Sequence, residues 1–478
     1  MIAMPPTPAK PGPAPMPAAA FPMMRLSEAA TAVGGRLSGA DATFNGVSID
    51  SRAIAPGELF VALKGERFDA HAFVGEAATR GAAGALVARD VRGTTAPSGT
   101  TLPQVACDDT RLALGRLAST WRSRFALPLV ALTGSNGKTT VKEMTAAILA
   151  AHAGSREAVL ATRGNLNNDI GVPLTLLGLR DWHRHAVIEM GMNHAGEIDY
   201  VARLAKPRAA LVNNAQRAHV GLLGSLEAVA RAKGEIYVAL GAEGVALVNA
   251  DDAFAPLWTS LAAGRRVVTF GFSTDAAVRG SLVDGQLRLV TPTDAFAVTL
   301  QVAGEHNARN AVAACAIAHV LEIPPWAIQA GLAAFAGVPG RQEKRAGRGG
   351  ATVIDDSYNA NPESMFAALA VLAAAPGRRI LVMGDMGELG DGAAAMHAEV
   401  GVRARAAGID RLLALGPLSA SAVAACGTGA IHFADIEAIT EAAVAEDRPG
   451  TTILVKGSRF MRMERVAERL APGGSHAA

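Results

Sequence analysis

A short glycine-rich stretch carries the residues with the clearest chemical capacity. An apolar run over residues 127–133 leads into Gly134-Ser135-Asn136-Gly137-Lys138-Thr139-Thr140, and a helix-compatible stretch follows over 141–151. A strand, a tight glycine loop and a helix start form a phosphate-binding loop, because backbone N–H groups and the helix dipole then face an anion. Lys138 can neutralise phosphate charge, and the Thr139 hydroxyl can ligate Mg²⁺. The stretch predicts nucleotide binding rather than a glycine turn with an accidental lysine, but its spacing is tighter than the common pattern and leaves the reaction open.

Three ionisable residues follow the loop in positions that suit chemistry. Glu189 ends an apolar strand predicted next to the loop, which suits Mg²⁺ held directly or through water, although a surface glutamate gives the same pattern. His219 follows a strand predicted at 209–212, and Lys233 lies within a helix predicted at 226–240. Taken alone, these two residues indicate a structural or solvated histidine and a lysine on a solvated helix face.

Three polar segments are candidate ligand sites. Residues 163–171 are an asparagine-rich loop between a predicted strand and a helix, where asparagine either binds a polar substrate or stabilises a turn. Residues 306–310 open a long alanine-rich helix, 311–321, in which Asn307 could simply be a cap. Residues 355–362 are a dense polar cluster between a strand and a helix, which suits a ligand site or a capping loop.

Composition limits the class of protein. The chain has 478 residues and a net charge of +2, so we expect about three domains and no nucleic-acid partner. The basic segment 341–348 is predicted to be a solvated loop. Three scattered cysteines indicate small buried residues in a reducing compartment, and no apolar run reaches the roughly 18 residues that span a bilayer. We therefore expect a cytoplasmic protein without membrane insertion, whose Pro/Ala-rich residues 1–22 form a disordered tail. A monomer is expected as well, although composition does not give the oligomeric state.

Alternating strand and helix patterns predict an α/β protein with three folded domains, 23–107, 108–337 and 338–478. The first mixes short strands, such as 59–63, with a helix at 72–80. The second reads as a doubly wound parallel sheet with strands at 186–189, 209–212 and 245–248, and with a β-hairpin around Asp284-Gly285. A hinge is predicted at 337–340, and the last domain has predicted strands at 352–354, 380–383, 412–415 and 453–455.

Together these blocks resemble the ATP-dependent Mur ligases of peptidoglycan synthesis, in the family's order and over nearly the whole chain after the tail. The tight loop 133–139 is similar to that family's own variant. The other matching motifs are Ile188-Glu189-Met190-Gly191, His219, Ala232-Lys233-Gly234-Glu235-Ile236, His306-Asn307 with Asn310, Pro339-Gly340-Arg341 and Lys456-Gly457-Ser458-Arg459. The resemblance implies a small N-terminal α/β domain for a UDP-linked substrate, a central P-loop ATPase-like sheet and a C-terminal Rossmann-like domain that binds ATP and D-alanyl-D-alanine.

Within the family, the closest resemblance is to members that add D-alanyl-D-alanine to UDP-MurNAc-tripeptide. Residues 164–173, 211–214 and 355–362 carry it, and the Asp-Asn-Pro-Arg motif of members that add a diamino acid does not occur in the sequence. The implied reaction converts the tripeptide carboxylate to an acyl phosphate with ATP, and the dipeptide amine then displaces phosphate. Closure of the last domain over the nucleotide would keep the acyl phosphate from water.

The resemblance also implies a role for each matching residue. Lys138, Glu189, His219 and Lys233 are the expected catalytic residues, and Lys233 corresponds to a lysine that is carbamylated in relatives. Up to two Mg²⁺ ions are expected on Thr139, Glu189 and His219. The expected ATP contacts are Gly134, Ser135, Asn136, Gly137, Lys138, Thr139, Thr140, Asn307, Asn310, Arg341 and Asp356, with Asn310 on adenine. The expected substrate contacts are Asp50, Ser51, Arg52, Lys64, Asn165, Asn168, Tyr358, Asn359, Asn361 and Ser458.

Two alternatives stay open at this point. A folate polyglutamate ligase would share the loop and the domain plan, although the 355–359 block and the first domain argue against it. A nucleotide-dependent regulatory or motor protein would hydrolyse ATP without an amino-acid product.

Overall fold

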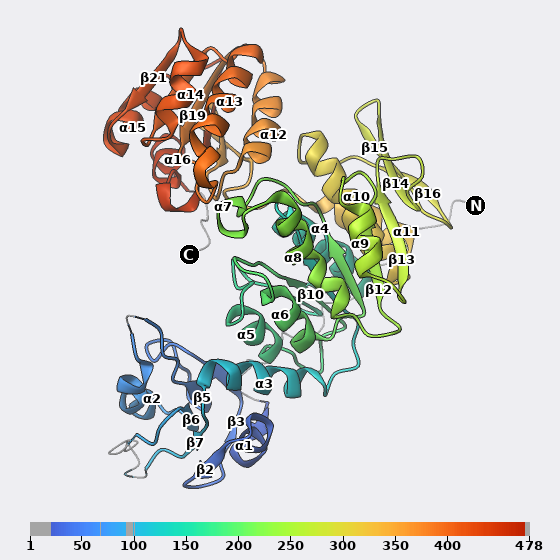
Figure 1. Ribbon diagram of the computed structural model, residues 1–478, viewed down its shortest axis with the longest axis vertical. Coiled ribbons are helices and arrows are strands. Elements are labelled where there is room, and N and C mark those ends of the chain that lie inside the picture. Colours follow the sequence, from blue (N-terminus) through green and yellow to red (C-terminus); the bar gives the residue numbers. More distant parts are fainter. Residues whose placement is uncertain (1–20, 67, 92–98, 100, 474–478) are drawn as a thin grey trace, which may run out of the picture. The chain divides into compact units, whose positions relative to one another are not determined.

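The structure is a computed structural model that describes residues 21–66, 68–91, 99 and 101–473. The chain forms two compact units, Met1–Ser123 and Arg124–Ala478. Figure 1 shows the first unit in blue to cyan and the second in green to red. The tail predicted over residues 1–22 lies outside the described residues except for Phe21 and Pro22.

The first unit is built on a five-stranded sheet in the order β2-β7-β6-β5-β4, parallel except for β2 against β7. Its elements are β1 (Met24–Arg25), α1 (Leu26–Val33), β2 (Arg36–Ser38), β3 (Thr43–Phe44), β4 (Gly46–Ser48), β5 (Glu58–Val61), η2 (Ala70–Phe73), α2 (Val74–Thr79), β6 (Gly84–Val87), β7 (Gln104–Ala106) and α3 (Thr110–Arg122). The unit extends past residue 107, where the sequence suggested a boundary, because α3 packs on α1 and Arg116 Nη1 donates to the Val33 carbonyl at 3.1 Å.

The second unit contains two sheets. The larger has nine strands in the order β16-β15-β14-β13-β12-β11-β8-β10-β9, parallel from β9 through β14 and antiparallel from β14 to β16. Its strands are β8 (Leu129–Thr133), β9 (Val159–Ala161), β10 (His185–Glu189), β11 (Ala209–Val212), β12 (Val245–Asn249), β13 (Arg266–Gly271), β14 (Val278–Val283), β15 (Gln286–Val290) and β16 (Ala295–Val298). The hairpin predicted around Asp284-Gly285 is confirmed as β14–β15.

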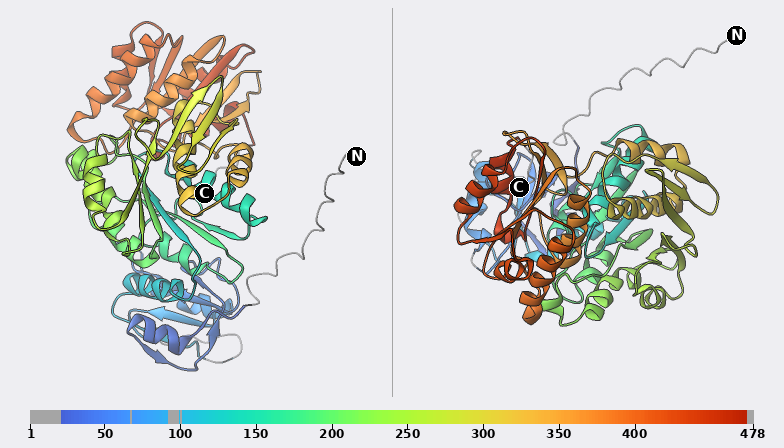
Figure 2. Two further views of the ribbon diagram at one scale, coloured as in Figure 1. Left: turned by 90° about the vertical axis from the view of Figure 1, so that its right-hand side faces the viewer. Right: turned by 90° about the horizontal axis from the view of Figure 1, so that it is seen from above.

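Helices cover both faces of this sheet, as Figure 2 shows. They are α4 (Lys138–Ala153), α5 (Gly171–Leu177), α6 (Glu197–Ala205), α7 (Val220–Leu223), α8 (Leu226–Val238), α9 (Ala255–Leu261), α10 (Glu305–Val320) and α11 (Pro325–Ala334). Alternate strand residues such as Val130, Leu132 and Leu211 pack with α4, α10 and α11 in one apolar core. The alanine-rich sequence of α10 lets it run buried along nearly its whole length. The doubly wound parallel sheet predicted for the centre of the chain is confirmed.

The smaller sheet of the second unit has the order β17-β18-β22-β19-β20-β21, with only β17 antiparallel. Its strands are β17 (Glu343–Ala346), β18 (Thr352–Asp356), β19 (Arg378–Gly384), β20 (Arg411–Leu415), β21 (Ala430–Phe433) and β22 (Thr451–Lys456). Its helices are α12 (Pro362–Ala373), η3 (Gly390–Gly392), α13 (Ala393–Ala406), α14 (Ser419–Cys426), α15 (Ile436–Ala445), η4 (Arg459–Met461) and α16 (Glu464–Leu470). Two apolar clusters, one on each face, confirm a Rossmann-like layered domain.

The structure corrects two predictions. The basic segment 341–348 is not a solvated loop, because residues 343–346 form strand β17. Arg345 is only 8% exposed and lies 2.9 Å from carboxylate oxygens of both Glu343 and Asp355. Asn307 is not a helix cap either, because α10 begins at Glu305 with Gly304 as its cap.

No helix in the described part of the chain is both long and apolar enough to cross a membrane. The cysteines Cys107, Cys315 and Cys426 are buried and free, as predicted.

Candidate active site

Functional residues gather where parallel strands end. In the nine-stranded sheet, the carboxyl ends of the neighbouring strands β10, β8, β11 and β12 carry Glu189, the phosphate loop, Asn213 and Asn249. In the six-stranded sheet, the adjacent strands β18, β22 and β19 end at Asp356, Lys456 and Gly384. Ligands of open parallel sheets bind at this edge, because loops and helix starts converge there.

A cavity of about 1210 Å³ lies between these two edges. We call its lining from the nine-stranded sheet the phosphate wall: residues 135–140, Glu189, Asn213, Asn214 and Gln216, with Asn307 and Asn310 of α10. We call its lining from the six-stranded sheet the C-terminal wall: residues 356, 358–361, 387–388, 456 and 458–460. The volume exceeds that of most small-molecule sites and suits a nucleotide beside a second substrate.

The phosphate loop starts its helix earlier than predicted. Helix α4 begins at Lys138 rather than near residue 141, with Gly137 as its cap at φ 78°. A side chain at Gly137 would clash, since an added Cβ would lie 2.3 Å from Asn310 Oδ1 and 2.6 Å from Asn213 Nδ2. Lys138 and Thr139 therefore occupy the first helical turn, where free N–H groups and the helix dipole favour an anion.

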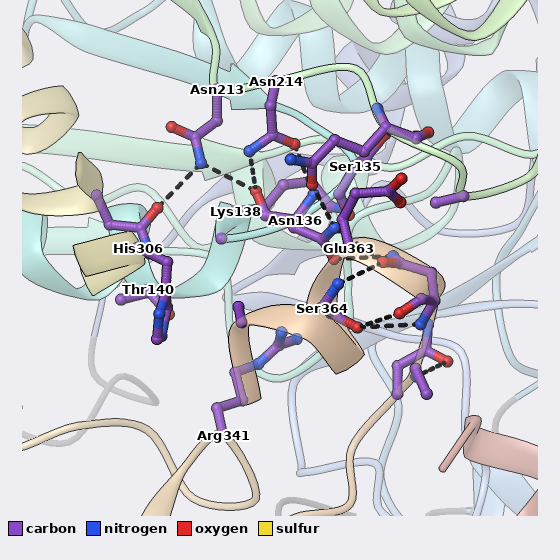
Figure 3. A pocket seen from close by; sticks show the side chains of 18 of the residues that line it. Ser135, Asn136, Lys138, Thr140, Asn213, Asn214, His306, Arg341, Glu363 and Ser364 are labelled. Carbon is purple, nitrogen blue, oxygen red and sulfur yellow. Dashed lines mark hydrogen bonds between the residues drawn. The ribbon is translucent and has the colours of Figure 1, made fainter. Parts of the chain in front are cut away.

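Asn136, at the tip of the loop, is held from several directions (Figure 3). Its backbone N–H donates to Asn214 Oδ1 at 2.8 Å, and its carbonyl accepts from the side-chain amides of Asn213 and Asn214 at 2.9 and 3.1 Å. Its own amide donates to Gln216 Oε1 at 2.6 Å. Asn213 also donates to Asn310 Oδ1 at 3.0 Å, so α10 is tied to the same network. The loop is preorganised by side chains that follow β11.

Two lysines lie beside the loop. Lys138 Nζ donates to the carbonyl oxygens of Gly134 and Ser135 at 2.7 and 3.3 Å. Burial lowers the pKa of Lys138, while Glu189 acts in the opposite direction and Arg341 adds to the lowering. Lys233 is only 1% exposed, which rules out the solvated helix face. Burial and then the charge of Lys138 lower the pKa of Lys233 well below its usual range.

Glu189 and Thr139 meet directly. The Thr139 hydroxyl donates to Glu189 Oε2 at 2.8 Å, and the Asn167 amide donates to Glu189 Oε1 at 2.8 Å. Glu189 is 2% exposed, so it is not a surface glutamate. Two buried oxygen donors at the phosphate loop fit the hard, oxygen-preferring Mg²⁺. Across the described residues, no group of three His, Cys, Asp or Glu side chains could hold a metal by itself.

His219 faces the C-terminal wall. It caps α7 in the left-handed region at φ 61°, and its Nδ1 lies 2.6 Å from Glu388 Oε2. The imidazole lowers the pKa of Glu388. Just beyond, the Gly221 N–H donates to the Glu388 carbonyl at 2.9 Å. The structure thus pairs His219 with Glu388, and its part in a metal site stays a prediction.

The C-terminal wall centres on a buried ion pair. Lys456 Nζ donates to Asp356 Oδ2 at 2.7 Å and to the Asn359 carbonyl at 2.9 Å. Ser458 Oγ donates to the Ala360 carbonyl at 3.1 Å and accepts from the Gly387 N–H at 2.8 Å. These bonds connect the ends of β18, β22 and β19 in one surface.

Direct contacts join the two walls. Asn136 and Asn361 exchange amide hydrogen bonds of 3.0 and 2.9 Å, while Asn361 also caps α12. Arg217 Nε donates to Glu363 Oε1 at 2.6 Å, and its Nη1 donates to Glu399 Oε2 at 3.0 Å. The segment that holds the phosphate loop therefore also holds helices α12 and α13.

The remaining predicted substrate residues have ordinary structural contacts. In the first unit, Arg52 forms a two-pronged pair with Asp50 at 2.9 and 2.7 Å, Ser51 donates to Glu76 Oε2 at 2.9 Å, and Lys64 is exposed. In the second unit, Asn165 is exposed, and Asn168 Oδ1 accepts from the Gly171 N–H at 2.8 Å at the start of α5. Their substrate roles stay predictions.

The sequence interpretation gave no individual role to several residues that the structure brings to the site, although Asn167 and Lys456 lie within motifs that it named. They are Asn167, Gln216, Arg217, Glu363, Glu388 and Lys456. Gln216 and Arg217 lie in the same loop as His219, between β11 and α7, which is a usable signal. Glu363 and Glu388 come from the other sheet, and no local pattern marks them.

Comparisons with known proteins agree with this architecture. Three family models match: "Mur ligase family, catalytic domain" at residues 43–122, "Mur ligase middle domain" at 132–318, and "Mur ligase, glutamate ligase domain" at 340–459. The chain is 46% identical to UDP-N-acetylmuramoyl-tripeptide--D-alanyl-D-alanine ligase of Escherichia coli K12, over 94% of this chain and 99% of the relative.

Solved structures agree as well. MurF from Acinetobacter baumannii is 36% identical with a TM-score of 0.85, covering 94% of this chain and 99% of that one. MurF from Thermotoga maritima, solved in complex with ADP, is 26% identical with a TM-score of 0.75, covering 89% and 96%. With three matching domain models in order and a close relative along almost its full length, this chain belongs to the Mur ligase family.

Proposed function

We propose that this Mur ligase joins D-alanyl-D-alanine to UDP-MurNAc-tripeptide with ATP, giving UDP-MurNAc-pentapeptide, ADP and phosphate. One observation carries the proposal: one cavity of about 1210 Å³ has a phosphate loop on one wall and a polar surface with both acidic and basic side chains on the other. The name of the E. coli relative, which is 46% identical, supports the same reaction in peptidoglycan synthesis.

In the first step, the tripeptide carboxylate attacks the γ-phosphate of ATP, forming an acyl phosphate and releasing ADP. The loop N–H groups and the first turn of α4 bind the phosphates, and Lys138 moves from its loop carbonyls to the transferring group. Arg341 approaches the same phosphates, since it lines the cavity together with Lys138 and Thr140. Asn307 and Asn310 contact the base, and Asp356, oriented by Lys456, accepts from the ribose.

Thr139 and Glu189 would hold Mg²⁺, with His219 beside a second ion. Mg²⁺ held there would supply positive charge that screens the phosphates from the attacking carboxylate. Asn167 orients Glu189 by occupying Oε1, so that Oε2 faces Thr139. This arrangement keeps the carboxylate in place without a metal.

Lys233 is proposed to carry a carbamate. CO₂ reacts with a neutral amine, and burial together with the neighbouring Lys138 favours the neutral form of Lys233. The neutral amine bonds to CO₂ and releases a proton, which leaves an anionic carbamate beside the Lys138 cation.

In the second step, the dipeptide amine attacks the acyl phosphate, an amide forms and phosphate leaves. Tyr358, Asn359, Asn361 and Ser458 position the dipeptide on the C-terminal wall. Asp50, Ser51, Arg52 and Lys64 of the first unit bind the UDP-sugar end, and Asn165 and Asn168 contact the peptide. The enzyme acts as a monomer in the cytoplasm, where ATP and UDP-linked precursors are available.

One assay tests the function. Purified protein, ATP and Mg²⁺ are combined with UDP-MurNAc-tripeptide and D-alanyl-D-alanine, and both phosphate and the pentapeptide product are measured. We expect product and phosphate in equal amounts, and neither without both peptide substrates. Phosphate release that ignores the two substrates would favour a nucleotide-driven switch or motor, and a glutamate-dependent product with a folate substrate would favour the folate ligase.

A further inference from the structure

The C-terminal wall contains a cation whose partner in the reaction has not been assigned. Six lysine or arginine side chains line the described cavity: Lys138, Lys233, Arg309, Arg341, Lys456 and Arg459. Lys138 binds loop carbonyls, and Lys456 is paired with Asp356 at 2.7 Å. Arg309 is paired with Asp251 and with Glu305. Lys233 lies buried beside Lys138. Arg341 lines the cavity next to Tyr358, and the carboxylate paired with Arg459 is that of Glu464, at 3.7 Å.

Arg341 and Arg459 share one aromatic ring but serve different parts of the cavity. Their guanidinium carbons lie 4.1 and 5.6 Å from the centroid of the Tyr358 ring. Arg341 also lines a smaller cavity together with Thr140 and Asn307, so Arg341 belongs to the phosphate side. Arg459 is adjacent to Ser458 and Phe460, on the side of the loop that carries Gly387 and Glu388.

The surroundings of Arg459 suit a small, charged, weakly apolar ligand. Its side chain is 50% exposed, and its Nη1 lies 3.7 Å from Glu464 Oε1, beyond hydrogen-bond distance. Phe460 is 64% exposed and lies against Gly387, where an added Cβ would come within 2.8 Å of the ring. A guanidinium presents two parallel N–H groups that match a carboxylate, and the ring offers an apolar surface for methyl groups.

Accepting the proposed function, we infer that Arg459 binds the C-terminal carboxylate of the incoming dipeptide and so selects a free-acid D-alanyl-D-alanine. An extended dipeptide is about 7 Å long. Tyr358, Arg459 and Phe460 line the same cavity, whose volume of about 1210 Å³ accommodates a ligand of this length. With its carboxylate on Arg459 and its methyl groups near Phe460, the dipeptide directs its amine past Tyr358 toward the acyl phosphate.

The test compares D-alanyl-D-alanine with its C-terminal amide, D-alanyl-D-alaninamide, which keeps the amine and both methyl groups but lacks the negative charge. Steady-state kcat/KM is measured for each at saturating ATP, Mg²⁺ and UDP-MurNAc-tripeptide. A hydrogen-bonded charge pair predicts that the wild type prefers the acid by about 10- to 100-fold. In Arg459→Gln, kcat/KM for the acid should fall by that factor, while kcat/KM for the amide stays unchanged. In Arg459→Lys, kcat/KM for the acid should be partly restored.

Arg465→Gln is the matched control, since Arg465 is 55% exposed, paired with Glu437 and outside the cavity lining. It should leave both values unchanged. A wild type that uses acid and amide equally overturns the inference, as does an Arg459→Gln variant that loses both substrates equally or raises only the KM of UDP-MurNAc-tripeptide. Failure of the proposed function looks different, because the wild type then makes no product from the free acid.

Discussion

The two walls of the cavity are held in different ways. On the phosphate wall, residues that follow β11 hold Asn136 at three points. They accept hydrogen bonds from its N–H and its side-chain amide, and they donate one to its carbonyl. On the C-terminal wall, Lys456 and Ser458 order the strand ends, but Arg459 and Phe460 remain half or more exposed. The phosphate wall is therefore already ordered for the triphosphate, whereas the C-terminal wall leaves exposed side chains that can contact the incoming dipeptide.

This difference predicts which kinetic constant a mutation in each wall should change. A preorganised phosphate site contributes to the transition state of phosphoryl transfer, so its loss should appear in turnover. The C-terminal wall and its connections contribute to binding and closure, so their loss should appear mainly in KM. The following variants test that division, from the phosphate wall outward.

The largest effect is expected at Lys138. Lys138→Ala removes the cation nearest the transferring phosphoryl group, so kcat should fall by at least about 10³-fold. Its Nζ contacts only loop carbonyls in the structure, so the thermal midpoint and circular dichroism should stay close to the wild type. Near-normal ATP turnover by a folded variant would contradict the assignment of this wall to phosphate.

Lys233 should have the next largest effect. Lys233→Ala removes the proposed carbamate, and we expect activity to fall by about 10²-fold. The vacated space should admit formate or acetate, which restores an anion and part of the activity. In wild-type protein supplied with ¹³CO₂, a carbamate carbon should appear by NMR and be absent from the variant.

Lack of both the NMR signal and the rescue would show that Lys233 acts as an amine. Lys142→Met is the control for loss of a buried lysine. Lys142 is also 1% exposed, but it donates to the Thr162 carbonyl and does not line the cavity. Short acids should not rescue it.

Much of the phosphate wall was predictable from sequence, because its signals are local. Gly134 to Thr139 lie in one segment, and Glu189 is marked by the end of its strand. A capping role for the 355–362 loop was one of the two interpretations of the sequence, and Asn361 does cap α12, but its bond to Asn136 joins residues 225 positions apart. Burial of Lys233 and the pairing of His219 with Glu388 depend on how two sheets meet, which neither spacing nor periodicity records.

Substitution of Arg217, which connects the two walls, should have an intermediate effect on the kinetic constants. Arg217→Gln removes ion pairs to Glu363 and Glu399 at side chains that are 25–34% exposed. We expect the KM values for ATP and dipeptide to rise together by about 3- to 10-fold, with kcat little changed. The wild-type KM values should approach those of the variant at high salt, because partly exposed ion pairs are screened.

Arg231→Gln is the matched control, since Arg231 forms an exposed pair with Glu227 on α8. It should change neither KM nor salt dependence. A charge exchange, Arg217→Glu with Glu363→Arg, should recover part of the loss. If Arg217→Gln changed only kcat, the proposed difference between the two walls would be wrong.

The smallest effect is expected behind the C-terminal wall, at His397. Its Nε2 accepts from the Met386 N–H at 2.8 Å and its Nδ1 donates to the Ala393 carbonyl at 2.7 Å, which fixes the loop that carries Glu388. Burial lowers the pKa of His397, so the folded protein keeps it neutral. As pH falls below about 6.5, the unfolded chain binds a proton that the folded chain does not, and stability is lost by up to about 1.4 kcal/mol per pH unit.

His397→Gln removes that contribution. Urea unfolding at pH 8 should show a destabilised variant, because two buried hydrogen bonds are disturbed. At pH 5.5 the gap between wild type and variant should narrow, since only the wild type loses the stability linked to this histidine. A gap that stays constant between the two pH values would mean that His397 titrates alike in both states, and the loop behind Glu388 would then not depend on a neutral imidazole.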